Sequence, residues 1–354
     1  VGYQAGAANT TGTENVFIGL DAGTAVTTGA GHVFVGWKAG DAVTTASQST
    51  AIGDQALSAA STGSHNTAVG YNAMLANTTG DENTAVGSTA LDANTTGTQL
   101  TALGKGALSA NTTASANTAL GHQSMIFNTT GASNTAVGKE ALKSNTTATE
   151  NVAVGATAGD ALTTGSENVV IGSDALSTAT TNGNNVAIGR MALKVNTAAA
   201  NTAVGHQSMI ANTTGTQNVA VGKNALDSNT TADGNVAVGY NSLESNTTAS
   251  NNVAVGENSM RENTTGTANV AVGQGALDAN TTSDNNTAIG YNALTASTAE
   301  GNTAVGKEAM KTNTTGYRNV AVGKESLADN TTGNENVAIG NNALEKNTTA
   351  DNNV

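Results

Sequence analysis

Residues 66–82 read Asn-Thr-Ala-Val-Gly-Tyr-Asn-Ala-Met-Leu-Ala-Asn-Thr-Thr-Gly-Asp-Glu, and variants of this 17-residue segment fill the chain. Every copy contains a Gly that is preceded by Val, Ile or Leu. We number each copy from that Gly as position 0, so that Val69 is at position −1 and Ala73 at position +3. A chain made of one repeated segment is typical of solenoids and related repeat architectures.

The repeat runs through the whole sequence of 354 residues. The position-0 Gly occurs 21 times between Gly2 and Gly340, and the regular step is one full segment. Two steps are shorter by a single residue, from Gly189 to Gly205 and from Gly290 to Gly306, and in both the missing residue falls in the Asn-Thr-Thr turn. We therefore expect a single repeat array over residues 1–354, with variant copies in 1–60 and regular copies in 61–354.

The repeat predicts an all-β fold, a parallel β-solenoid with one copy per coil. Seventeen residues are too few for the common two-helix repeats, and Asn-Thr-Thr-Gly is a poor helix former. Positions −4 to −1 alternate with period two, as a short strand does, while the Gly at position 0 and the Asn-Thr-Thr-Gly segment supply turns. About 21 coils at about 4.8 Å each give an array about 100 Å long. The absence of Pro agrees with strands that are paired throughout.

The composition excludes several function classes. A net charge of −13 opposes binding to nucleic-acid phosphates. No apolar run approaches the roughly 20 residues of a membrane span, so no membrane insertion is expected from this segment. The chain has no Cys, which removes thiolate chemistry and Cys-bound zinc.

Two apolar stripes are expected on opposite faces of the strand. The side chains at positions −3 and −1 lie on one face of the strand, and the side chain at position −2 lies on the opposite face. We expect the −1 side chains to fill the interior of the coil. Position −2 then faces outward, yet it is apolar in all 20 coils that have it, and is Ala in 17. A strand that is apolar on both faces is covered on both. This predicts a homo-oligomer interface, although an abundant and surface-tolerant Ala is the alternative. The candidate interface residues are Phe17, Phe34, Ala68, Ala85, Ala102, Ala119, Ala136, Ala153, Val170 and Ala187.

Other repeated positions predict internal packing. Position +4 is Leu or Met in 17 copies, and the four exceptions are Gly6, Gly23, Gly40 and Gly159. Three of these copies have an apolar residue at +7 where most have Asn. Asn at −4 and +7 and Thr at +8 and +9 are expected to form ladders from coil to coil. Each Asn-Thr-Thr is also a glycosylation sequon, but ladder and turn chemistry already accounts for the Asn.

The units at 185–189, 235–239 and 336–340, Asn-Val-Ala-Ile/Val-Gly, resemble the head repeat of trimeric autotransporter adhesins. The fuller 17-residue unit is similar to repeats in phage tail fibres and in bacterial surface fibres of the endosialidase-chaperone type. The resemblance implies a left-handed β-roll, a side-by-side trimer, and an extracellular place on a cell surface or a virion. The adhesin head repeat is shorter than the unit found here, and no coiled-coil stalk, membrane anchor or chaperone domain occurs in this chain.

The two ends of the sequence lie within repeats. Val1-Gly2 are positions −1 and 0, and Asn353-Val354 are positions −4 and −3. Repeat arrays normally end in capping units. We therefore expect the array to be truncated at both ends, with either a longer natural chain or end-to-end stacking of copies.

No residues gather in a way that predicts catalysis, a metal or a cofactor. His122 and His206 occupy equivalent positions in near-copies five coils apart, and no copy departs from the pattern to bring several carboxylates together. The protein is therefore not expected to be an enzyme. Trp37, Tyr71, Tyr240 and Tyr291 at position +1 are weak candidates for contacts with sugars, but +1 is more simply a tolerant rim position that also takes Lys.

These observations favour a structural fibre or adhesin shaft that displays, or attaches to, a surface. Its expected partners are other copies of itself and an unidentified surface receptor or glycan. The alternative is an ice- or polysaccharide-binding solenoid that uses its Thr and Asn ladders. A polysaccharide-cleaving solenoid comes third.

Overall fold

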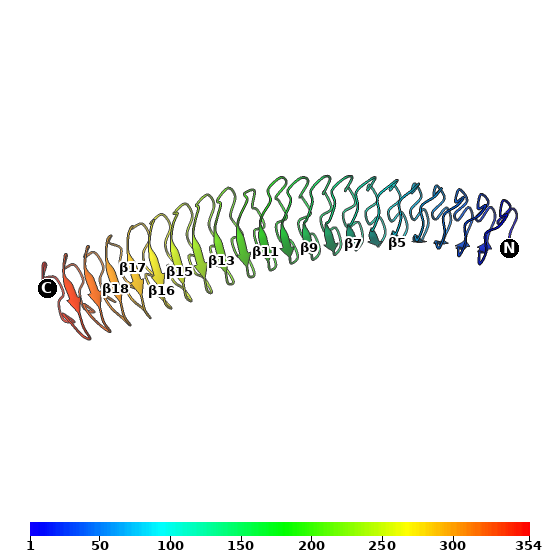
Figure 1. The fold of residues 1–354 in the computed structure, drawn as a ribbon. Helices are drawn as coiled ribbons and strands as arrows, with labels where there is room; N and C mark the ends of the chain where they lie inside the picture. The colour runs from blue at the N-terminus through cyan, green and yellow to red at the C-terminus, as the bar shows by residue number, and fades with distance from the viewer. The chain divides into compact units, whose positions relative to one another are not determined.

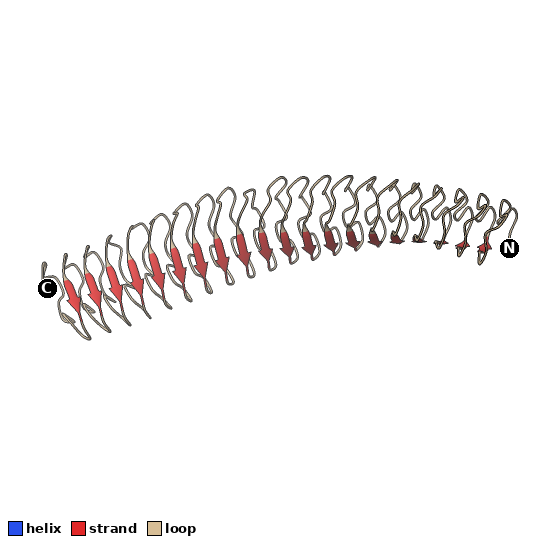
Figure 2. Ribbon diagram, viewed as in Figure 1, coloured by secondary structure: helices blue, strands red, loops and turns tan.

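The computed structural model describes all residues from 1 to 354. The chain divides into two compact units, Val1–Gly183 and Asn184–Val354, and each is described by itself. Both units consist of short strands and turns without any helix (Figure 2). No part of the chain forms a helix with the length and hydropathy needed to cross a bilayer.

Each unit contains ten strands of three residues, and every strand occupies positions −3 to −1 of its repeat. The first unit holds β1 (Val16–Ile18), β2 (Val33–Val35), β3 (Thr50–Ile52), β4 (Thr67–Val69), β5 (Thr84–Val86), β6 (Thr101–Leu103), β7 (Thr118–Leu120), β8 (Thr135–Val137), β9 (Val152–Val154) and β10 (Val169–Ile171). The second unit holds β11 (Val186–Ile188), β12 (Thr202–Val204), β13 (Val219–Val221), β14 (Val236–Val238), β15 (Val253–Val255), β16 (Val270–Val272), β17 (Thr287–Ile289), β18 (Thr303–Val305), β19 (Val320–Val322) and β20 (Val337–Ile339).

Within each unit, successive strands lie side by side in chain order and pair in parallel (Figure 1). In the first unit Ala68 of β4 is opposite Ala85 of β5, so equivalent positions of neighbouring repeats face each other. The pairing of β17 with β18 keeps this register across a 16-residue step, with Ala288 opposite Ala304. The predicted parallel β-solenoid with 17-residue coils is therefore confirmed. There are 20 strands for 21 repeats because only Val1 precedes the first Gly.

The Gly at position 0 ends each strand at a place where only Gly fits. Gly70 has a φ of +135°, and a Cβ built on it would lie 2.6 Å from the carbonyl oxygen of Gly87 in the next coil. A side chain would therefore strain the backbone and collide with the neighbouring coil. This contact explains why Gly occurs at position 0 in every repeat.

The interior of a coil is formed by small and medium side chains together with buried amides. In the coil of Gly70, Ala68, Ala73 and Met74 are completely buried. Two Asn side chains of each regular coil, at −4 and +7, are buried as well, as Asn66 and Asn77 show. The cross-section is therefore filled by one Ala from the strand, an Ala and a Leu or Met from the turn, and two amides.

The expected orientation of the strand is wrong. The −2 side chains point into the coil, and the −1 side chains point away from it: Ala51 is completely buried, whereas its neighbour Ile52 is 40% exposed. The residues expected at an oligomer interface therefore belong to the interior. Nine of them are completely buried within their own chain and Phe17 is half-buried; the nine are Phe34, Ala68, Ala85, Ala102, Ala119, Ala136, Ala153, Val170 and Ala187.

The larger −2 residues show the physical reason for this orientation. The ring of Phe34 occupies the space that a +4 side chain fills in other coils, since a Cβ on Gly40 would lie 2.5 Å from its Cε2 atom. Gly23 faces Phe17 in the same way, at 2.6 Å from Cε1. Position −2 therefore packs against position +4, and Phe occurs at −2 only in coils whose +4 residue is Gly. Val170, whose own coil has Leu176 at +4, lies next to Gly159 at +4 of the preceding coil.

Buried Asn side chains join each coil to the next, which confirms the predicted Asn ladders. Asn94 Nδ2 donates to Asn77 Oδ1 at 2.8 Å and to the Gly97 carbonyl at 3.0 Å. In the second column, the backbone N–H of Asn83 donates to Asn66 Oδ1 at 3.0 Å. These amides find their partners inside the coil, and the sequon residue Asn77 has no exposed surface to offer a glycosyltransferase.

Candidate functional site

The side of the sheet that points away from the coil is the most distinctive surface of each unit. We call it the outer sheet face and define it as positions −3 and −1 of the strands. Position −3 is always Thr or Val and position −1 is always Val, Ile or Leu, so no charged residue occurs on this face. Its exposed members are Val16, Ile18, Val33, Ile52, Thr84, Leu103, Val152, Val154 and Ile171 in the first unit, and Val221, Ile289, Val322 and Ile339 in the second.

The outer sheet face follows directly from the in-register pairing. Because Val69 lies opposite Val86 and Thr67 opposite Thr84, equal side chains form two columns, with about 4.8 Å between neighbours. Scattered apolar residues are normal on protein surfaces, but monomeric proteins seldom expose continuous apolar patches beyond a few hundred Å². An uncharged face with a continuous column of Val, Ile and Leu at position −1 is typical of an interaction surface.

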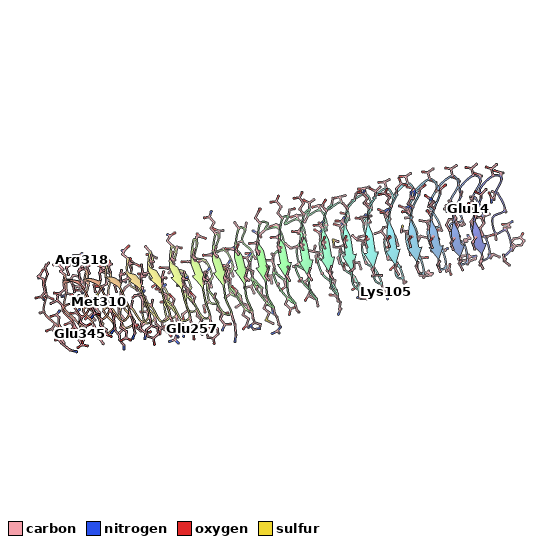
Figure 3. The ribbon with its side chains drawn as sticks, turned by 60° about the horizontal axis from the view of Figure 1, so that its bottom comes forward. Glu14, Lys105, Glu257, Met310, Arg318 and Glu345 are labelled. Carbon is pink, nitrogen blue, oxygen red and sulfur yellow. The ribbon has the colours of Figure 1, made fainter.

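Charged residues lie in the turns that follow the strands. Glu140 at position +2 pairs with Lys143 Nζ at 3.1 Å and with Lys139 Nζ at 3.5 Å. The hydrogen bond from Lys143 is the largest influence on Glu140, and it lowers the pKa of the carboxyl group. In the second unit Figure 3 shows Glu257 and Glu345 on the edge opposite Arg318. The negative charge of the chain is thus kept off the outer sheet face.

The aromatic residues proposed as weak ligand candidates are exposed, but they do not form one site. Exposure is 43% for Trp37, 54% for Tyr71, 45% for Tyr240 and 47% for Tyr291. Trp37 and Tyr71 are two coils apart, and Tyr240 and Tyr291 are three coils apart, which is about 10 and 14 Å at the rise of one coil. Lysine Nζ atoms lie over three of the four rings at 5.1 to 5.9 Å. Their arrangement fits a rim position that also holds charges.

The Thr ladders predicted from the sequence have one exposed row. At position +8 the hydroxyl of Thr78 donates to the carbonyl oxygen of Thr95 at 2.9 Å, so this row bonds to the main chain of the next coil. At position +9 Thr79 is exposed. Only the +9 row therefore presents regularly spaced hydroxyl groups on the surface, and this array is a single row of residues.

Titratable groups do not gather into a cluster of the kind that binds metals. No three His, Asp or Glu side chains lie close enough together to hold a metal ion. His32 replaces the −4 Asn of its coil and is completely buried. Its Nε2 atom bonds to the carbonyl of Ala46 at 2.8 Å, and its Nδ1 accepts the N–H of Ser49 at 3.3 Å. His32 is thus a structural substitute for Asn within the ladder.

The architecture defines the class of this protein as a parallel β-solenoid repeat protein. Comparison with known protein-family models gives no match. A search of curated proteins likewise finds no similar sequence. The likeness to adhesin heads and tail fibres therefore rests on the repeat motif.

Proposed function

We propose that this chain is a non-catalytic structural fibre or adhesin shaft, in which copies pack side by side and in parallel through their outer sheet faces. The observation that carries the proposal is an uncharged face of Val, Ile, Leu and Thr on a coil whose interior is already filled. A second copy of the same chain is the occupant that this face fits best. Both would present the same columns with the same spacing, so contacts made in one coil repeat in every other.

An assembly with closed rotational symmetry would cover the outer sheet face of every chain. In a parallel cyclic assembly each chain uses the same surface and no apolar face is left open. The resemblance to trimeric adhesins implies three chains. The turns that hold the charged residues would remain at the outside of the assembly, where they solubilise it and limit the repulsion between chains of net charge −13.

The proposed biological role is to display binding functions, or to mediate attachment, at a cell surface or a virion. A solenoid made of equal coils supplies regular spacing, and the buried ladders join every coil to its neighbours. A receptor or glycan would then meet the same surface chemistry at a fixed interval along each unit.

Self-association is tested by sedimentation equilibrium, with small-angle scattering as a measure of the cross-section. The face variant places Lys at three −1 positions of consecutive coils, where the side chains are partly exposed and a long Lys stem can reach water in the single chain. The control variant places Lys at exposed +9 positions of the same three coils. The substitutions are Val204→Lys, Val221→Lys and Val238→Lys for the face, and Thr214→Lys, Thr231→Lys and Thr248→Lys for the control.

We expect a trimeric mass for the unmodified chain and for the control variant. The face variant is expected to be monomeric with an unchanged circular dichroism spectrum, because unpaired ammonium groups cannot be buried between apolar faces without a large desolvation cost. A monomeric unmodified chain, or a face variant that associates as well as the control, would refute the proposal.

A further inference from the structure

A cavity of about 540 Å³ opens on the second unit at the coil that follows Gly290. This coil is one of the two shortened coils, and its hydrogen bonds show which residue is missing. The Thr298 N–H donates to the Thr314 carbonyl, as a +8 residue does. Ser297 Oγ donates to the carbonyl of Ala299 at 3.4 Å, as the +7 Asn does to the +10 residue in regular coils. Ala299 is therefore at +10, and position +9 is skipped.

The skipped residue leaves a gap in the row of +9 side chains. Thr282 and Thr315 hold position +9 in the coils before and after, and both line the cavity. We call this cavity the notch. Its volume is within the range of about 300 to 1,000 Å³ that is usual for ligand pockets. The notch therefore lies at the place of the deletion, where the row of +9 side chains is interrupted.

Around the notch lie groups of four different chemistries. Tyr317 offers an aromatic ring that is 40% exposed, and the guanidinium carbon of Arg318 lies 5.6 Å from the ring centre. Asp284 accepts the Thr267 N–H at 2.6 Å through Oδ1, which fixes this carboxylate at the edge of the cavity. Glu300 is exposed and makes no side-chain hydrogen bond or ion pair within the chain. Figure 3 shows Arg318 at the edge of the unit, away from Glu257 and Glu345.

The other 16-residue coil provides an internal comparison. There Asn196 Nδ2 donates to the carbonyl of Ala198 at 2.7 Å, so the same +9 position is skipped. The residues that correspond to Glu300 and Gly301 are Ala199 and Ala200. The two coils thus share the deletion, but only the coil after Gly290 places a carboxylate there.

We propose that the notch binds a neutral carbohydrate. An exposed ring offers a face for the C–H surface of a sugar, and carboxylates and threonine hydroxyls offer acceptors and donors for its hydroxyl groups. The predominantly polar lining disfavours an apolar ligand. Asp284 and Glu300 outnumber the single Arg318, which also pairs with Glu335 at 3.6 Å, so an anionic sugar is disfavoured by charge.

If the chain mediates attachment as proposed above, the notch identifies neutral carbohydrate as the class of ligand. The biological meaning of glycan binding at the notch therefore rests on the proposed function. Glycan binding and self-association are measured in separate experiments, so that either can fail without the other. The face variant leaves the notch intact, and the notch variants leave the outer sheet face intact.

The test uses the full chain on an array of neutral, sialylated and uronic-acid-containing oligosaccharides, followed by calorimetric titration of the neutral oligosaccharide with the strongest signal. One variant refills the gap by inserting a Thr between Thr298 and Ala299, and its control carries the same insertion between Thr197 and Ala198. A second variant is Tyr317→Ala, with Phe127→Ala as the control for loss of an exposed ring outside the notch. Circular dichroism establishes that each variant is folded.

We expect a neutral oligosaccharide to bind the unmodified chain and both controls equally. The Thr insertion in the notch is expected to abolish binding, and Tyr317→Ala to weaken it about tenfold or more through loss of ring contact. Should the insertion fail to fold, comparison of Tyr317→Ala with Phe127→Ala decides the question. Binding of only anionic glycans, binding that is unchanged in Tyr317→Ala, or no binding on the array would each overturn the proposal.

Discussion

Replacement of one ladder amide, Asn111→Ala, tests whether the buried Asn columns hold the coils together. Asn111 is completely buried and lies in the middle of the +7 column of the first unit. Its Nδ2 donates to Asn94 Oδ1 at 3.0 Å and to the Ala114 carbonyl at 3.1 Å. Its Oδ1 accepts from Asn128 Nδ2 at 2.9 Å. The Ala variant therefore removes three hydrogen bonds at once.

The cost follows from the groups that lose their partners. Asn94 Oδ1 still accepts the Gly97 N–H at 3.1 Å, and Asn128 Nδ2 still donates to the Gly131 carbonyl at 3.0 Å. The Ala114 carbonyl and the second amide hydrogen of Asn128 are left unpaired. At about 1 to 3 kcal/mol for each unpaired buried group, the variant loses about 2 to 6 kcal/mol of stability.

Urea unfolding gives the total loss, and hydrogen exchange measured by mass spectrometry locates it in the coils on either side of Asn111. The matched control is Thr113→Ala, which removes an exposed +9 hydroxyl two residues away and is expected to change stability by no more than about 0.5 kcal/mol. If Asn111→Ala costs less than about 1 kcal/mol, the low end of the range for one unpaired group, or no more than the control, the amide columns do not support the coils and the reasoning fails.

Two further predictions concern the first unit. Burial lowers the pKa of His32 below its ordinary value of 6.5, and Nδ1 accepts the Ser49 N–H only when it is unprotonated. The contribution of neutral His32 to stability is therefore complete above the ordinary pKa and decreases as the pH falls below it. In thermal melts from neutral to mildly acidic pH, the His32→Asn variant should not show this loss. Equal pH profiles for the variant and the unmodified chain would contradict the prediction. Phe34→Ala should cost about 3 to 5 kcal/mol in urea unfolding, and Gly40→Leu should be unfavourable alone but stabilising in the Phe34→Ala background. Additive effects of the two changes would show that the positions do not share one space.

The period, strand positions and register could be predicted from the sequence because they depend on local chemistry and repetition. Val69 and Gly70 mark the end of a strand in every copy, and equal copies pair most simply in register. The two 16-residue coils confirm the rule, since their missing residue lies in the turn and leaves the strand pairing unchanged.

The direction of the strand could not be predicted from alternation alone. Alternation separates two faces, but it does not say which one is inside when both are apolar. The sequence led us to expect the Val and Ile side chains of position −1 in the interior. Packing decided otherwise, because the turn already supplies a Leu or Met and two amides to a narrow cross-section.

A signal for the correct direction was present in the variant coils. Phe17 shares its coil with Gly23, and Phe34 shares its coil with Gly40, so a large −2 residue occurs where +4 has no side chain. Such compensation in size indicates that the two positions touch. The notch had a comparable signal in the 16-residue step, but the sequence did not show which groups would surround the gap.

The uniform register from coil to coil determines which insertions and deletions in the gene preserve the contacts between coils. Duplicating or removing a whole repeat would rejoin Ala to Ala and amide to amide, so a length change by recombination would create no mismatched contact. Both losses of a single codon in this chain fall at position +9, where the backbone N–H shares its acceptor in the next coil with the N–H of position +8, as Thr79 and Thr78 share the Thr95 carbonyl. Lineages of this protein should therefore differ by complete repeats far more often than by fractions of one.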